Sequence, residues 1–161
     1  MVDLDQLVTK NFRLREFAVS AHHPGMAAAI TFTEAEVEKI YLLCATILQP
    51  IRNRFGLVIV TSGKRTEELN EAVGGDDDSQ HLHCEVGDIE TPEADIEVVH
   101  TWVATTLPHA YGQCLLYYDK HLRPKRIHVG LPSRRIRSSL RVGYKFGGAF
   151  HPRPPNREER A

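Results

Sequence analysis

A long stripe of apolar residues in the first third of the chain is the strongest constraint on its fold. The residues that recur there at helical spacing are Val37, Ile40, Tyr41, Cys44, Ile47, Leu48, Ile51 and Phe55. They predict an amphipathic helix of about five turns. Thr33 and Glu36 form a capping-box pattern at its start, and Pro50 predicts a kink or break near Leu48 or Gln49.

Short runs of β-branched and aromatic residues predict the surface on which this helix packs. They lie at 57–60, 86–89, 113–118 and 126–131, and the last two form a hairpin joined by 119–125. Residues 66–73 predict a short helix. Thr91-Pro92-Glu93 opens a second long helix, with proline at its first position, that ends at Pro108. We therefore predict a small α+β domain with helices on one face of a mainly antiparallel sheet.

The length and composition indicate one domain. We expect it to span residues 1–145, with 146–161 as an extended tail rich in Pro and Arg. No run approaches the roughly 18 apolar residues of a membrane span, and no signal peptide is visible. The net charge of −1 hides a basic segment from Lys120 onward. That segment alone does not favour nucleic acid as a partner, because interleaved aromatic residues and a known binding motif are lacking.

The segment "SQHLHCEVGDIE", residues 79–90, contains a cluster of side chains that could bind a metal or take part in catalysis. It is open to three readings: a metal site, a catalytic pair, or a polar loop that enters a buried strand. His81 and Asp88 can share a metal only if the chain bends near 82–84, and a catalytic zinc needs a third protein ligand. His128 is the best candidate, on the opposite face of its strand from Ile127 and Val129. Taken alone, the spacing favours a structural histidine.

Several motifs in order change that balance. "NFRLREF" (11–17), "TSGKRTEELNEAVGG" (61–75), "SQHLHCEVGDI" (79–89) and "IHVGL" (127–131) together resemble the M15 family of zinc peptidases. This family includes D-Ala-D-Ala carboxypeptidases and phage peptidoglycan hydrolases. The closest likeness is to the short form with the pattern "TSGYRS..LN..VGG...SQH..G.A.DI". The resemblance covers most of residues 11–131.

The resemblance implies a zinc site in a cleft on the sheet. His81, Asp88 and His128 match the three Zn²⁺ ligands, and Arg65 matches an arginine that pairs with a substrate carboxylate or a developing oxyanion. Ser79 and Gln80 match residues that support the first ligand.

The sequence departs from the family pattern at several positions. Cys84 stands at a usual Gly, Val86 at a usual Ala, Lys64 at a usual Tyr and Gly130 at a usual Ser. The family's acidic positions hold Lys125 and Tyr117 here. For the general base, the sequence leaves Asp119 and His83 as alternatives, and loss of activity is a third reading.

The implied function is hydrolysis of a peptide bond in the stem peptide or crossbridge of peptidoglycan, through a water activated by zinc. The family likeness and the lack of a visible export signal predict a phage-encoded protein. It would be made in the host cytoplasm and would act at the wall after release or as part of the virion. The alternative is a non-catalytic relative with a structural or wall-binding role. The scissile bond and the oligomeric state stay open.

Overall fold

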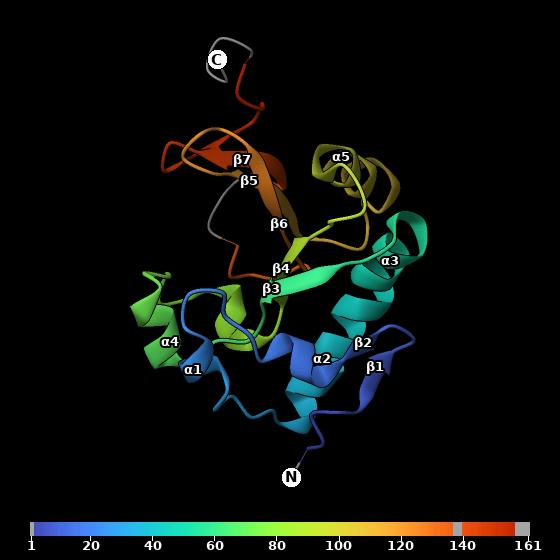
Figure 1. Ribbon diagram of the computed structural model, residues 1–161, viewed down its shortest axis with the longest axis vertical. Coiled ribbons are helices and arrows are strands. Elements are labelled where there is room, and N and C mark those ends of the chain that lie inside the picture. Colours follow the sequence, from blue (N-terminus) through green and yellow to red (C-terminus); the bar gives the residue numbers. More distant parts are fainter. Residues whose placement is uncertain (1, 137–139, 157–161) are drawn as a thin grey trace.

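The computed structural model describes residues 2–136 and 140–156 and confirms the predicted α+β class (Figure 1). Its large sheet consists of β3 (Ile59–Ser62), β4 (Val86–Glu90), β5 (Gln113–Tyr118), β6 (Pro124–Gly130), β7 (Val142–Phe146) and β8 (Ala149–His151). The spatial order is β3-β4-β6-β5-β7-β8. All neighbouring pairs are antiparallel except β5 and β7, which run parallel. A separate small sheet pairs β1 (Leu7–Thr9) with β2 (Phe12–Arg13).

The helices lie before β3, between β3 and β4, and between β4 and β5. They are α1 (Pro24–Ala27), α2 (Glu34–Leu43), α3 (Gln49–Phe55), α4 (Glu67–Ala72) and α5 (Ile96–Thr106), the 3-10 helices η1 (Leu14–Phe17) and η3 (Gln80–His83), and the π-helix η2 (Cys44–Leu48). Figure 1 shows α3 and α5 on the same side of the large sheet. Among the described residues, no helix is long and apolar enough to cross a membrane.

The first long helix begins as the capping box predicts. The Thr33 hydroxyl accepts a hydrogen bond from the Glu36 amide at 3.3 Å, and the Glu36 carboxylate accepts one from the Thr33 amide at 2.8 Å. Of the predicted kink or break at Pro50, the break does not occur, because α2, η2 and α3 follow one another without interruption. The π-helical turn directly before Pro50 has the Gln49 amide bonded to the Cys44 carbonyl. This wider turn accommodates a proline that would clash with the backbone of a regular α-helix.

The apolar stripe packs in the core as predicted, with Val37 and Phe55 half-buried at its ends and Tyr41 as the exposed member. Ile40, Cys44, Ile47, Leu48 and Ile51 are buried. Tyr41 is instead 56% exposed. It belongs by spacing to the edge of the stripe, where an aromatic ring can face solvent.

The second long helix begins later than the sequence suggests. Residues 92–94 form a turn, in which the Ala94 amide bonds the Thr91 carbonyl at 3.1 Å. Asp95 is the N-cap, and its carboxylate accepts a hydrogen bond from the Glu97 amide at 2.9 Å. The predicted start at Pro92 is therefore wrong, because a capping carboxylate at Asp95 satisfies the first turn better than a proline at N1 does.

The predicted hairpin of β5 and β6 and the predicted strand β4 are confirmed, while β3 lies two residues later than expected. Strands β7 and β8 are not predicted by the sequence pattern. The expected boundary between domain and tail at 145/146 falls inside β7, and residues as far as His151 belong to the sheet. The last residues of the expected tail, 157–161, lie outside the described part of the chain.

Alternation along β4 and β6 gives the sheet two different faces. Ile89, Ile127 and Val129 are buried in the core beneath the helices. Asp88 and His128 occupy the alternate positions and point to the other face. One face of the sheet thus holds the domain together, and the other is free to carry polar side chains.

We predict that Ile127→Ala destabilises the domain by about 2–5 kcal/mol, because it leaves a cavity in the core beside His128. Ile59→Ala removes the same atoms from a side chain that is 42% exposed and should cost less than about 1 kcal/mol. Urea unfolding monitored by circular dichroism measures both. Equal losses for the two variants would contradict this assignment of the core face.

Candidate metal centre

The centre of the open face is a pair of residues on adjacent strands. Asp88 of β4 and His128 of β6 are direct partners in the antiparallel register. Directly opposed side chains on one face of a sheet have Cβ atoms about 5 Å apart. Here His128 Nδ1 lies 2.7 Å from Asp88 Oδ1. Strand pairing alone therefore brings together two residues that are 40 positions apart in the chain.

The third member of the group, His81, comes from η3. Ser79 is the N-cap of this helix, and its hydroxyl accepts a hydrogen bond from the His81 amide at 3.4 Å. His81 Nδ1 donates a hydrogen bond to the Gly63 carbonyl at 2.7 Å. This bond selects the tautomer in which Nε2 carries the free lone pair. Nε2 lies 3.5 Å from Asp88 Oδ1.

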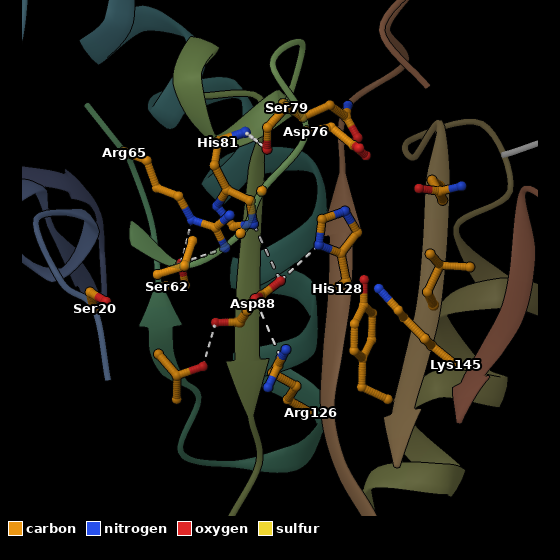
Figure 2. Close-up of a pocket in the computed structure, with 18 of the residues that line it drawn as sticks. Ser20, Ser62, Arg65, Asp76, Ser79, His81, Asp88, Arg126, His128 and Lys145 are labelled. Atoms are coloured by element: carbon orange, nitrogen blue, oxygen red, sulfur yellow. Dashed lines mark hydrogen bonds and ion pairs between the residues drawn. The ribbon is translucent and has the colours of Figure 1, made fainter. Parts of the chain in front are cut away.

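These three residues form a group that can hold a metal ion. One ligand atom from each of His81, Asp88 and His128 lies within 4.8 Å of the others. Figure 2 shows the two histidines directed at the carboxylate of Asp88. A tetrahedral metal with ligands at about 2.0–2.1 Å keeps its ligand atoms roughly 3.4 Å apart. The 3.5 Å between His81 Nε2 and Asp88 Oδ1 matches that spacing, while the 2.7 Å between His128 Nδ1 and Asp88 Oδ1 is a hydrogen bond that a bound ion would replace.

The electrostatics of the group favour the protonation states that bind a cation. Burial lowers the pKa of the His81 imidazole below its usual value, so the ring is neutral near pH 7. Burial alone would raise the pKa of the Asp88 carboxyl, but its interactions with the His81 and His128 imidazoles hold that pKa well below its usual range. The group therefore presents an anionic oxygen next to an imidazole nitrogen with a free lone pair.

The bend predicted between His81 and Asp88 is present, and Cys84 makes it. Cys84 has φ 57° and ψ 32°, the left-handed conformation that a glycine adopts without strain. A cysteine at this position costs about 1 kcal/mol. Burial raises the pKa of the Cys84 thiol to about 12, so it is protonated and a poor ligand. Among the described residues, the candidate metal group does not include it.

Gly130, another departure from the family pattern, is explained by packing. A Cβ at this position would lie 2.9 Å from the Glu85 carbonyl oxygen and 3.0 Å from Val86 Cβ. The backbone of β6 approaches β4 too closely there for the usual serine. Lys64, which replaces a tyrosine, forms an ion pair with Glu36 at 2.6 Å and lies over the ring of Phe32 at 5.4 Å.

The metal group lies in a cavity of about 530 Å³ on the open face. Arg65 lines it, with Nε 3.4 Å from the Ser62 hydroxyl and Nη1 3.3 Å from the Asn70 amide oxygen. Its backbone amide also bonds the His81 carbonyl at 3.0 Å. The structure thus brings Arg65 into the same cavity as the proposed ligands. Ser79 and Gln80 also line the cavity, and the Gln80 amide donates to the Leu131 carbonyl at 3.2 Å.

The two candidates for a general base are not brought to this cavity. Asp119 lies in the turn between β5 and β6, where its carboxylate accepts hydrogen bonds from the amides of His121 and Arg123 and from Arg123 Nε. These hydrogen bonds give the Asp119 carboxylate a structural role in closing the turn, so its presence there needs no catalytic explanation. His83 lies 3.9 Å from Asp78. Neither Asp119 nor His83 is among the described residues that line the cavity.

Sequence reasoning missed several residues that do line it. Asp76 and Asp78 lie in the loop before η3, and Arg126 and Lys145 lie on β6 and β7. Asp76 and Asp78 have the pattern of a solvated acidic loop, which carries no signal of a site. Arg126 is two residues from His128, and alternation along the strand places both on one face. That spacing is a signal by which Arg126 could have been found.

The sequence that contains the motifs around the cavity matches a known protein family. The sequence model of the peptidase M15 family matches residues 10–123, most of the chain. The chain belongs to the peptidase M15 family. Because the M15 family is a family of metallopeptidases, this chain is a metallopeptidase by family. The match includes Arg65, His81 and Asp88 but ends before His128, so the geometry of the sheet is what adds His128 to the group. No curated protein and no solved structure matches the chain.

We predict that Gly63→Ala disrupts the metal centre although residue 63 is not a ligand. A Cβ there would lie 2.3 Å from the Phe17 carbonyl oxygen, so β3 and η1 must separate and the carbonyl that holds His81 must move. The expected loss of stability is about 1–3 kcal/mol, as for overpacked sites. Thermal unfolding with and without added zinc measures this loss and the weaker stabilisation by metal.

Gly25→Ala is the matched control, because a Cβ at Gly25 meets nothing within 4 Å. It should change stability by less than about 0.5 kcal/mol and leave the effect of zinc unchanged. A Gly63→Ala protein that behaves like Gly25→Ala would refute the role of the Gly63 carbonyl.

Proposed function

We propose that this M15 chain is a zinc peptidase that hydrolyses a peptide bond of peptidoglycan, in the stem peptide or the crossbridge. The observation that carries the proposal is the group of His81, Asp88 and His128 inside a cavity large enough for a short peptide. The likeness of its motifs to the short phage form supports the substrate class. The same likeness supports a phage-encoded protein that acts at the cell wall.

The choice of zinc rests on the donor set. Two imidazoles and one carboxylate match a catalytic zinc site with three protein ligands. A bound zinc ion would supply a Lewis acid and lower the pKa of a water molecule to near neutrality. The protein contributes the orientation of the ligands: Gly63 fixes the tautomer of His81, and the pairing of β4 with β6 fixes Asp88 against His128.

Arg65 is the residue that we assign to the substrate. Its guanidinium is held by Ser62 and Asn70 in the same cavity as the ligand group. A planar fork with several N–H donors can bind a substrate carboxylate or stabilise the oxyanion that develops on the scissile carbonyl. Ser79 and Gln80 act indirectly, since they support η3 and the wall of the cavity.

Proton transfer requires a group inside the cavity. Asp119 and His83 lie outside its lining, so the carboxylates left as candidates are Asp76 and Asp78. Asp78 forms an ion pair with Arg135 at 3.4 Å. Among the described residues, no ion pair engages Asp76, which makes it the better candidate for a proton acceptor.

A second candidate function is a non-catalytic, wall-binding or structural protein, for example in a phage particle. The observation that favours it is the loss of acidic side chains at the family's positions, now Lys125 and Tyr117. This reading predicts that the protein binds peptidoglycan or zinc without turnover.

Mass analysis of muropeptides after digestion of purified peptidoglycan tests the proposal. The zinc-loaded wild type should release new peptide fragments, a chelator should stop the release, and added zinc should restore it. His81→Ala should abolish release, because a ligand is lost, whereas His109→Ala changes an exposed histidine and should not. Intact peptidoglycan after incubation with the zinc-loaded wild type would overturn the proposal and favour the non-catalytic reading.

The assignment of Arg65 makes a separate prediction. Arg65→Ala should lower kcat/KM on a soluble muropeptide by about 10²–10³, the usual effect of losing one donor to an oxyanion. Arg65→Lys should recover only part of this loss, because an ammonium group lacks the planar fork. Arg153→Ala, at an exposed site, serves as the control. An Arg65→Ala protein with wild-type kcat/KM would refute the assignment.

A further inference from the structure

One wall of the cavity comes from a hairpin outside the region that the family model matches. Strands β7 and β8 follow residue 123, where the match ends. Lys145 of β7 and Phe150 of β8 both line the cavity. The hairpin is attached to the rest of the sheet through the parallel pairing of β7 with β5. The family match therefore does not tell which residues form this wall; they are read from this chain alone.

The register of four strands places side chains in a row across this wall. Arg126 pairs with Tyr117, Tyr117 with Lys145, and Lys145 with Phe150. Lys145 Nζ lies 5.2 Å from the centroid of the Tyr117 ring and 4.7 Å from that of Phe150. On the other side of Tyr117, the Arg126 guanidinium lies 4.7 Å from the ring centroid. An ammonium held between two aromatic rings keeps a defined position without a carboxylate partner.

Among the described residues that line the cavity, Arg126 and Arg135 form ion pairs with carboxylates, whereas Lys145 and Arg65 do not. Arg126 lies 3.4 Å from Asp88, and Arg135 lies 3.4 Å from Asp78 and 2.9 Å from Glu85. Among the described residues, no carboxylate forms an ion pair with Lys145. Figure 2 shows its side chain extending towards the metal group from the β7 side, opposite Arg65. A half-buried cation that lacks a protein counter-ion attracts an anion from solution.

The side chain of Phe150 indicates which other chemical group the anionic ligand carries. Its side chain lines the cavity and yet is 43% exposed. A large apolar side chain beside a charged group suits a ligand with an apolar part and a charge on the same residue. A peptide residue with a small aliphatic group and a carboxylate has this chemistry.

We propose that Lys145, with Phe150, forms a subsite that binds a carboxylate of the peptide substrate on the side of the cavity opposite Arg65. The subsite rests on the proposed function for the identity of its ligand as a wall peptide. The carboxylate is either the C-terminal one or that of the D-Glu residue of the stem peptide, and the two sources share the same chemistry. The subsite selects acidic peptides with the carboxylate free and discriminates against their amidated forms.

Equilibrium binding tests the subsite apart from hydrolysis. Isothermal titration calorimetry on chelator-treated protein would use three stem pentapeptides: one with both carboxylates free, one amidated at the C-terminus, and one amidated at D-Glu. One of the two amidated peptides should bind about fivefold more weakly than the free peptide, which is the upper range for a partly exposed ion pair. The peptide that loses affinity identifies the carboxylate. Raising the salt concentration should reduce the difference.

Lys145→Met keeps the aliphatic stem between the two rings and removes only the charge. It should bring the affinities for free and amidated peptides within about twofold of each other. Lys145→Arg should retain the preference, which separates loss of charge from loss of structure. Lys120→Met, at an exposed turn outside the cavity lining, should leave the preference unchanged.

Two results would overturn the subsite: wild-type protein that binds the free and amidated peptides equally or binds none of them, and a preference that survives in Lys145→Met. These outcomes differ from failure of the proposed function. A protein that prefers the free carboxylate through Lys145 but never cleaves peptidoglycan would keep the subsite and lose the peptidase.

Discussion

The pairing of β4 with β6 is the constraint on which the rest of the structure depends. The register that sets Asp88 opposite His128 on one face also sets Ile89 opposite Ile127 on the other. A shift of one residue would exchange the two faces, bury the charged side chains under the helices and expose the core. The hydrophobic effect that holds α2, η2, α3 and α5 on the sheet therefore also enforces the geometry of the metal group. The same strand register therefore determines both the stability of the domain and the geometry of the candidate site.

The parts of the fold that follow local rules are predictable from the sequence. The capping box at Thr33 and the apolar periodicity of residues 37–55 indicate a helix by themselves, and the fold confirms both. The conflict at Pro50 is resolved by a π-helical turn, which no residue of the sequence indicates. Strand β7 contains Gly143 and pairs in parallel with a distant strand, so its partner depends on tertiary structure rather than on a turn signal.

The candidate site, like the fold, is predictable from the sequence only in part. Ordered motifs surround His81, Asp88 and Arg65, and alternation along the strand of His128 places it on the open face. Asp119 is a candidate by sequence because it is an acid close to a strand end, but its carboxylate is occupied by the amides of a turn. Lys145 and Asp76 reach the cavity through a strand crossover and a loop. Proximity of that kind arises only once the chain is folded.

The central claim is that His81, Asp88 and His128 together bind one catalytic zinc ion. X-ray absorption at the zinc edge, with elemental analysis of protein purified without chelator, tests it most directly. The account predicts a single zinc per chain with nitrogen and oxygen ligands near about 2.0–2.1 Å, no sulfur ligand, and loss of the metal in His128→Ala. Protein that contains no zinc, that binds it through a Cys84 thiolate, or that retains it after His128→Ala would contradict the account.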